Sequence, residues 1–252
     1  MDTEKQDGTR AAEARRLPLV LMYHSVEPYQ ADPYQVTVHP RRFDRQLRWL
    51  RRRGLRGVAM NELLRDRQHR QPGRGTGLVG LTFDDGYADF LTDVLPALRR
   101  YGFTATVFVI AGALGGHNSW DEPGPRKALM TAADVRRAAD AGMEIGSHSL
   151  NHVRLPEIDA AELQHEVSDS RRLLAELIGR DVTGFCYPYG AVGEREVQAV
   201  RAAGYDYACS VQSSPLDGRH ALPRAFIGDR DSSPRLFAKV ARHRLTVGRA
   251  AR

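Results

Sequence analysis

The feature that most constrains the fold of this chain is an alternation of short apolar runs with amphipathic stretches of helical spacing. Most of the runs are apolar throughout and rich in β-branched or aromatic residues, which is typical of strands buried in a parallel sheet. Helices usually supply the crossovers between parallel strands. The sequence therefore predicts an α/β fold, with candidate strands at residues 19–23, 55–59, 78–83, 104–110, 143–146, 184–187, 205–211 and 222–227.

Capping residues mark several of the predicted helices. Thr131 and Asp159 are favourable N-caps because their side-chain oxygens accept hydrogen bonds from free backbone N–H groups. Gly142, Gly179 and Gly204 stand where a left-handed residue ends a helix. The predicted helices are residues 42–53, 88–101, 131–141, 159–179 and 194–203.

Two arginine-rich segments, 41–56 and 235–252, contribute to a formal net charge of +6. Such clusters suit a nucleic acid, an anionic glycan or an anionic membrane surface. No nucleic-acid-binding motif or aromatic ladder accompanies them. We interpret them as a solvated helix face and a tail, and we expect no nucleic-acid partner.

The N-terminal sequence and the cysteines bear on the cellular compartment. Residues 1–16 are polar and charged, and the apolar piece at 17–22 is too short for a signal peptide or a membrane span. Cys186 and Cys209 do not form a C-x-x-C pair, and two cysteines are too few for a disulfide framework. We therefore expect a cytoplasmic protein without a transmembrane segment. The oligomeric state does not follow from the sequence.

Polar residues follow four of the predicted strands at the point where each strand ends. Asp84 and Asp85 follow the third strand, His148 the fifth, Tyr189 the sixth and His24 the first. In a parallel α/β barrel, the carboxyl ends of all strands lie on one face, and that face holds the active site. The sequence therefore predicts that these residues converge.

The aspartate pair and the histidine pair each have two interpretations. With Gly86, the two aspartates could form only a turn, and His148 and His152 could be a structural or surface pair. Together, however, Asp85 and the two imidazoles make a usual ligand set for a catalytic zinc-type site with open positions. We therefore interpret the combination as functional.

Three segments resemble the first three motifs of the polysaccharide deacetylase family, also known for its NodB homology and as carbohydrate esterase family 4. They are Thr82–Gly86, His148–His152 and Tyr187–Gly190. The resemblance extends from about Leu17 to Ile227 and implies a distorted (β/α) barrel with about seven parallel strands. It divides the chain into a flexible leader at 1–16, a deacetylase-like catalytic domain at 17–232 and a basic helix or tail at 233–252.

The resemblance implies a role for each motif residue. Asp85, His148 and His152 would bind a divalent metal, with Zn2+ expected first and Co2+ or Ni2+ as alternatives. Asp84 would be the general base, and the backbone N–H of Tyr189 would help to hold the oxyanion.

The general acid departs from the pattern of the best-known members, which place a histidine in a late Leu-x-His motif. His243 lies in the basic tail, and His220 precedes a strand instead of following one. The segment Tyr23–Val26 resembles the Tyr-His-Ser-Val motif of the poly-N-acetylglucosamine deacetylase branch. We therefore assign the acid to His24, with a hydrogen-bonded core histidine as the alternative.

A second departure concerns the arginine that many relatives place before the third motif. Cys186 occupies that position here, and a thiol cannot supply the charge. Arg224 is the candidate substitute that would hold Asp84, and a surface arginine is the alternative interpretation.

Candidate substrate contacts come from three parts of the chain. Trp120 could stack on a sugar ring while Asp121 binds its hydroxyls, although Trp120 could equally pack over the barrel rim. The third motif adds Tyr187 and Pro188, and Arg224 completes this set.

The expected function is hydrolysis of an N-acetyl group on an amino sugar, with a saccharide or glycoconjugate as the substrate. The same fold and metal ligands also serve O-deacetylation, deformylation of N-formyl sugars and opening of cyclic imides. A glycan-binding relative without turnover is the alternative from another class, but the presence of the metal ligands and the base argues against it.

Overall fold

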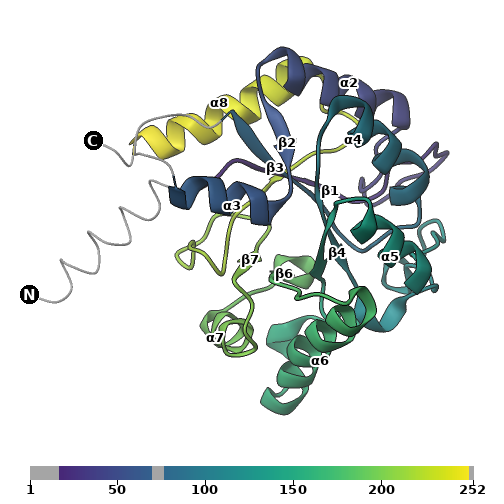
Figure 1. The fold of residues 1–252 in the computed structure, drawn as a ribbon, viewed down its shortest axis with the longest axis vertical. Helices are drawn as coiled ribbons and strands as arrows, with labels where there is room; N and C mark the ends of the chain where they lie inside the picture. The colour runs from purple at the N-terminus through teal and green to yellow at the C-terminus, as the bar shows by residue number, and fades with distance from the viewer. Residues whose placement is uncertain (1–16, 70–76, 250–252) are drawn as a thin grey trace, which may run out of the picture.

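The computed structural model describes residues 17–69 and 77–249, so the predicted leader at 1–16 lies outside the described residues. In the described part, a sheet with parallel strand pairings forms the centre of the molecule (Figure 1). The strand order is β7-β6-β5-β4-β3-β1-β8, and β2 pairs with β3. Each predicted run coincides with one strand, although β5 ends one residue later than predicted. The strands are β1 Val20–Tyr23, β2 Arg56–Val58, β3 Leu78–Phe83, β4 Thr106–Val109, β5 Glu144–Ser147, β6 Gly184–Cys186, β7 Tyr207–Cys209 and β8 Ala225–Phe226.

The segment before and within β8 joins the two ends of the sheet. Leu222 forms a parallel bridge with Cys209 of β7, and its carbonyl accepts a hydrogen bond from Ser210 N at 2.8 Å. Four residues later, Phe226 is in register with Met22 of β1. The sheet therefore curls into an irregular ring, which confirms the predicted distorted (β/α) barrel.

Helices surround this sheet on the outside (Figure 1). Thr131 and Asp159 cap α5 and α6 as predicted, because their side chains accept from the backbone N–H groups three residues later. Every predicted helix is present, and α3 is an additional one. The helices are α2 Pro40–Arg52, α3 Met60–His69, α4 Leu95–Tyr101, α5 Ala132–Asp140, α6 Ala160–Ile178, α7 Glu194–Ala202 and α8 Ser233–Arg249.

The helix predicted at 88–101 is not regular throughout. It begins with a π-helical turn, Phe90–Val94, in which the N–H of Leu95 donates to the carbonyl of Phe90. Pro96, in the first turn of α4, has no N–H to donate, so the regular α-helical hydrogen bonds cannot all form here. This irregular turn is the first helical element after β3.

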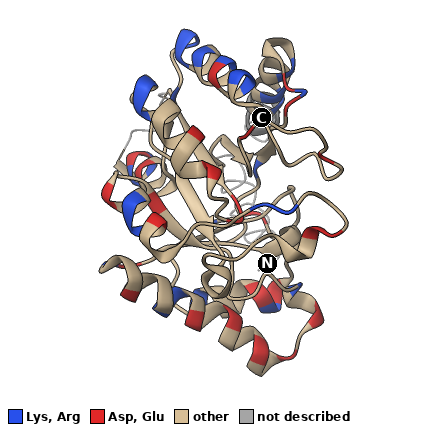
Figure 2. Cartoon of the chain, turned by 90° about the vertical axis from the view of Figure 1, so that its right-hand side faces the viewer, with Lys and Arg blue, Asp and Glu red and all other residues tan. Residues whose placement is uncertain are grey.

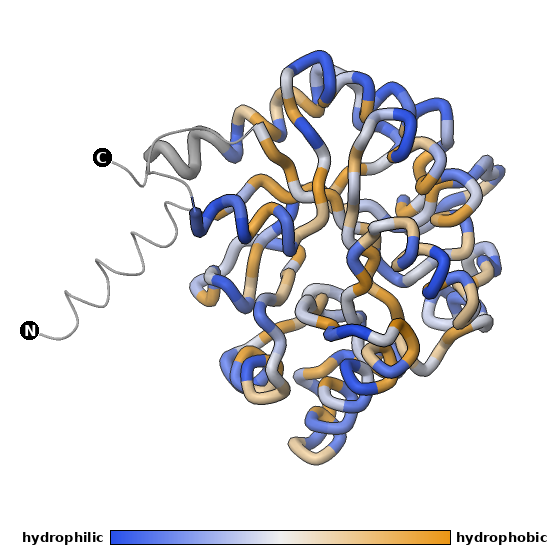
Figure 3. The backbone as a smooth tube through the Cα atoms, viewed as in Figure 1, coloured by the Kyte–Doolittle hydropathy of each residue, from blue (hydrophilic) through white to orange (hydrophobic). Residues whose placement is uncertain are grey.

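Aromatic side chains fill the interior beside β1 and β3. The rings of Tyr23 and Phe83 stack with centroids 5.2 Å apart, and Phe43 and Phe90 pack edge-on against them. Burial of each such ring contributes about 1.5–3 kcal/mol to folding. Apolar segments accordingly concentrate toward the centre of the molecule (Figure 3).

The outer helices carry charges of both signs (Figure 2). In the arginine-rich segment of α2, Arg48 pairs with Asp44, which also accepts from Arg100. The C-terminal α8 packs on the domain through the buried side chains of Leu236 and Val240. Among the described residues, no helix combines the length and the apolar character needed to cross a bilayer.

Candidate active site

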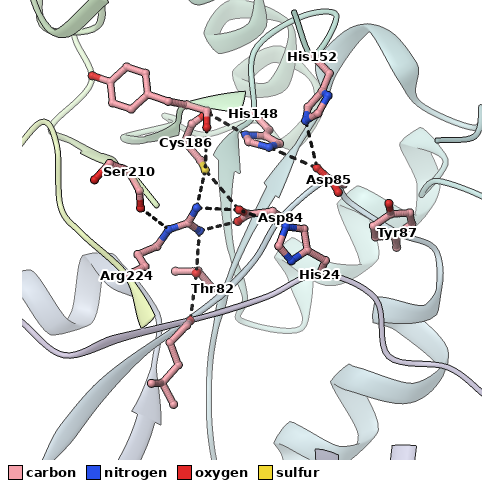
Figure 4. A network of polar contacts seen from close by, with 12 residues as sticks. His24, Thr82, Asp84, Asp85, Tyr87, His148, His152, Cys186, Ser210 and Arg224 are labelled. Atoms are coloured by element: carbon pink, nitrogen blue, oxygen red, sulfur yellow. Dashed lines mark hydrogen bonds and ion pairs between the residues drawn. The ribbon is translucent and has the colours of Figure 1, made fainter. Parts of the chain in front are cut away.

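Two imidazoles meet one carboxylate at the carboxyl end of the barrel strands (Figure 4). Asp85 follows β3, and His148 and His152 follow β5. Both histidine Nε2 atoms face the same carboxylate oxygen, Oδ1 of Asp85, at 3.3 Å and 3.4 Å. All three side chains are buried, so the structure brings together the predicted metal ligands.

The spacing of these atoms fits a metal ion. A tetrahedral ion with bonds of about 2.0–2.1 Å holds its ligand atoms about 3.3–3.4 Å apart. His148 Nδ1 lies 2.8 Å from the carbonyl oxygen of Cys186, so a proton on Nδ1 leaves Nε2 free to act as a ligand. Burial raises the pKa of Asp85, but hydrogen bonds from the two imidazoles outweigh it and hold that pKa well below its usual range. The donor set is therefore an ionised carboxylate with two imidazoles, which suits Zn2+ and similar ions.

A second group of potential ligands, Asp84, His148 and Cys186, also lies within metal-binding reach. Both oxygens of Asp84 already accept from Arg224. Burial raises the pKa of the Cys186 thiol, whereas metals bind the thiolate. This group is therefore a hydrogen-bonded cluster beside the predicted metal ligands.

The predicted base, Asp84, is held by Arg224, which lies just before β8 (Figure 4). The two terminal nitrogens of Arg224 donate to the two carboxylate oxygens at 2.6 Å and 2.7 Å. Arg224 also donates to Thr82 Oγ1 and to the carbonyl of Ser210, each at 3.0 Å. Burial raises the pKa of Asp84, but the charge and hydrogen bonds of Arg224 outweigh it, so the pKa is lowered. Asp84 is therefore an ionised proton acceptor at neutral pH.

Cys186 lies against the same ion pair. Its sulfur is 3.0 Å from a terminal nitrogen of Arg224 and 3.6 Å from Asp84 Oδ2. Cys186, which stands where many relatives have an arginine, thus lies beside the Asp84 carboxylate. Arg224, in the segment before β8, supplies the positive charge.

The predicted acid, His24, lies on the opposite side of the base. Its Nε2 is 4.0 Å from Asp84 Oδ2, and its side chain is only 16% exposed. The other candidates lie elsewhere, since His220 Nε2 hydrogen-bonds with the carbonyl of Tyr205 and His243 belongs to α8. Of the three histidines considered for the acid, His24 is therefore the one that lies beside Asp84.

Aromatic rings flank His152, a predicted metal ligand. The ring centroids of Trp120 and Tyr189 lie 4.4 Å and 4.6 Å from that of His152. Tyr189 is 45% exposed, and the guanidinium of Arg154 lies 4.3 Å from its ring centroid. Asp121, next to Trp120, accepts from Tyr87 Oη at 3.2 Å. This partly exposed aromatic surface borders the predicted metal ligands.

The family assignment follows from a match over more than half of the chain. A model of the polysaccharide deacetylase family matches residues 72–208, which include all three motifs. The chain belongs to the polysaccharide deacetylase family. YxkH of Bacillus subtilis (strain 168), a protein named for this family, is 28% identical over 229 residues, covering 88% of this chain and 76% of YxkH.

Other similar proteins are more distant in sequence, and the solved structures among them share the fold. The poly-beta-1,6-N-acetyl-D-glucosamine N-deacetylase of Staphylococcus aureus (strain MSSA476) is 21% identical over 206 residues, covering 77% of this chain and 68% of that protein. Among solved structures, the deacetylase PplD of Streptococcus pyogenes matches with a TM-score of 0.74 at 24% identity, over 89% of this chain and 98% of PplD. IcaB of Ammonifex degensii matches with a TM-score of 0.72 at 22% identity, over 88% and 96% of the two chains.

In this family member, a buried glutamate holds the histidine loop. Glu166 of α6 accepts hydrogen bonds from the backbone N–H groups of Leu150 and Asn151, each at 2.9 Å, and from Asn151 Nδ2 at 2.7 Å. Ser149 Oγ accepts from the N–H of His152 at 3.0 Å. Glu166 could not be recognised from the sequence, because one acid in a helix gives no signal that it points inward.

The motif residues also carry unusual backbone conformations. Asp85, Ser149, His152 and Tyr189 all have positive φ, between 59° and 70°, and Gln35 is the other described residue besides glycine with this property. Left-handed backbone is unfavourable for such residues and persists where the surroundings enforce it, commonly at functional sites. The turns that carry the predicted ligands are therefore held in place by the fold.

Three predicted substrate contacts of this family member have buried side chains, and their contact with a substrate stays a prediction. The side chain of Arg224 is buried against Asp84. The side chain of Tyr187 is also buried, and its hydroxyl donates to the carbonyl of His220. Pro188 is also buried. Trp120 and Asp121 remain candidates, since both are partly exposed near His152.

Proposed function

We propose that this chain is a metal-dependent deacetylase that removes N-acetyl groups from amino sugars of a polysaccharide and releases acetate. The observation that carries the proposal is the placement of Asp84, ionised and held by Arg224, between the Asp85 ligand cluster and His24. A base, an acid and a cation site within a few ångströms are the groups that hydrolysis of an amide requires.

Each group has a defined task in this reaction. A divalent ion, when bound, supplies Lewis-acid chemistry that polarises the acetamide carbonyl and activates water. Asp84 accepts the proton of the attacking water, and its lowered pKa keeps it ionised for this step. The backbone N–H of Tyr189 donates to the oxyanion. His24 then protonates the departing nitrogen, because an amine anion is a very poor leaving group.

The proposed substrate is a polymer containing N-acetylglucosamine. The staphylococcal relative is named for N-deacetylation of poly-beta-1,6-N-acetyl-D-glucosamine, which supports this choice. The surface of Trp120 and Tyr189 beside His152 suits the apolar face of a sugar ring. Zn2+ is the proposed ion, with Co2+ and Ni2+ as alternatives.

The test is acetate release from β-1,6-linked and β-1,4-linked N-acetylglucosamine oligomers and from free N-acetylglucosamine, with added Zn2+ or Co2+. We expect release from an oligomer, its loss with a chelator and its loss in Asp84→Asn. The matched control is Asp93→Asn, a change at a residue whose described side-chain contact is with its neighbour Thr92. Metal-loaded protein that releases no acetate from any of these substrates would refute the proposal, and release from an acetylated xylan instead would favour ester hydrolysis.

A further inference from the structure

The imidazole of His24 lacks the usual anchor of a catalytic histidine. Such residues are commonly oriented by a hydrogen bond at the nitrogen that does not react. Nδ1 of His24 is buried and has no hydrogen-bond partner among the described residues. The backbone that carries His24 therefore helps to set the position of the ring, together with its packing near Phe226.

That backbone is held by Asp89. One oxygen of its carboxylate accepts from Ser25 Oγ at 2.6 Å, and the other accepts from the N–H of Val26 at 3.0 Å. Asp89 lies four residues after the predicted ligand Asp85, at the irregular turn that follows β3. One side chain thus fixes the two residues after His24 relative to the loop of the base and the metal ligand.

Lys127 holds the same segment from the other side. Its Nζ donates to Ser25 Oγ at 2.8 Å and to Thr37 Oγ1 at 2.6 Å, and it pairs with Glu27 at 2.9 Å. Lys127 is buried, with its side chain 7% exposed. Ser25 therefore accepts from Lys127 and donates to Asp89, in a continuous chain of hydrogen bonds.

From the sequence, Asp89 and Asp93 are both interpreted as acids that suit a helix N-terminus. The structure separates them. Asp93 accepts a solvent-exposed hydrogen bond from the neighbouring Thr92, whereas Asp89 makes no helix-capping hydrogen bond and bonds to residues 63 and 64 positions earlier. A partly buried carboxylate and a buried ammonium on one serine are costly to desolvate.

We propose that Asp89 and Lys127 are positioning residues of the reaction, which hold Ser25 and Val26 so that His24 stays beside Asp84 to protonate the leaving amine. This inference rests on the proposed function of His24. It predicts a loss confined to steps that need the acid, which a general structural role would not produce.

The first experiment compares two substrates that differ in their need for an acid. An N-acetylglucosamine oligomer leaves as an amine and needs protonation, whereas 4-nitrophenyl acetate leaves as a stable phenolate. For Asp89→Asn and Lys127→Met we expect kcat on the oligomer to fall about tenfold to a hundredfold, with KM, metal content and ester hydrolysis nearly unchanged. Asp93→Asn should match the wild type. Equal losses on both substrates would overturn the inference.

A double-mutant comparison tests whether the two residues act through His24. Adding Asp89→Asn to His24→Ala should cause no further loss on the oligomer, because the group that it positions is already absent. A further loss of similar size to that in the wild-type background would contradict the inference. If Asp89→Asn does not fold, Ser25→Ala removes the hydroxyl between Lys127 and Asp89 and should give the same pattern with a smaller loss.

A measurement without substrate separates this inference from the proposed function. Hydrogen–deuterium exchange of the peptide spanning residues 24–38 should be faster in Asp89→Asn and Lys127→Met than in the wild type or Asp93→Asn. Unchanged exchange would overturn the positioning role even in an active enzyme. Faster exchange in a protein without any deacetylase activity would support the positioning of this segment and refute the proposed function.

Discussion

Arg224 donates hydrogen bonds to both carboxylate oxygens of Asp84, at 2.6 Å and 2.7 Å, although the two residues are 140 positions apart in the chain. The contact exists because the segment carrying Arg224 lies between β7 and β1, where the sheet closes. Cys186, at the place where many relatives have an arginine, touches both partners. The charge that holds the proposed base therefore reaches the same carboxylate from a different strand.

Replacing Arg224 with alanine should reduce turnover and raise the pH that the enzyme needs. Arg224 lowers the pKa of Asp84 against the opposing effect of burial, so without it the pKa rises and the base is protonated at higher pH. We expect kcat to fall about a hundredfold at pH 7 and the acidic limb of the pH–rate profile to move upward. Metal content should not change. An unaltered pH–rate profile would show that Arg224 does not lower the pKa of Asp84.

The control and a rescue variant sharpen this test. Arg219→Ala removes an exposed arginine that bonds to the carbonyl of Asp206, and it should leave the profile unchanged. Cys186→Arg combined with Arg224→Ala places a guanidinium on β6 beside the same carboxylate. Partial recovery of turnover in the double variant would show that the charge matters more than the strand that supplies it.

The barrel fold and the convergence of the motif residues could be predicted from the sequence. Polar residues at strand ends converge in any parallel barrel, so the meeting of Asp85 with His148 and His152 follows from local patterns and the barrel topology. The strands and the capped helices were predicted for similar local reasons. Contacts that depend on the direction of a side chain were harder to predict from the sequence, as the buried side chain of Tyr187 illustrates.

The supporting residues could not be identified from the sequence, because each carries an ambiguous signal. Glu166 lies in a long helix with exposed acids around it, and only the packing of α6 against β5 turns it inward. Asp89 and Asp93 look alike in the sequence, yet the π-helical turn and the nearby Ser25 separate them. Such roles depend on tertiary contacts over dozens of residues, which local patterns do not encode.

Metal binding should stabilise the fold and depend on Asp85, His148 and His152. An ion that binds only the folded state adds about 2.7 kcal/mol to the free energy of unfolding at a concentration of 100 times its Kd. We expect added Zn2+ to raise the Tm of the metal-stripped wild type. Asp85→Asn should abolish this shift, whereas Asp93→Asn should retain it. A zinc-dependent shift of full size in Asp85→Asn would place the ion elsewhere.

Glu166→Gln should weaken metal binding without removing a ligand. The carboxylate of Glu166 accepts three hydrogen bonds from the loop between His148 and His152, and the amide of glutamine can satisfy only part of them. Loss of such support commonly costs about 10–100-fold in metal affinity. Glu162→Gln, at an exposed position of the same helix, is the matched control. Competition with a chromogenic chelator measures both affinities, and equal values would contradict the role of Glu166.

The ionisation of Asp89 should make the wild type lose stability as the pH rises. Burial raises its pKa to about 6, with Glu27 adding to the rise and Ser25, Val26 and Lys127 opposing it. The folded state thus binds this proton more tightly than the unfolded state. The resulting stability is fully present below about pH 4, the usual range of aspartate, and is lost as the pH rises through about 6. Relative to Asp89→Asn, the wild type should lose on the order of 2–3 kcal/mol between pH 4 and pH 7.5. Urea unfolding of both proteins at the two pH values measures this difference, in which groups common to both cancel. A difference that does not change with pH would show that Asp89 has an ordinary pKa, and would remove the electrostatic cost ascribed to its burial.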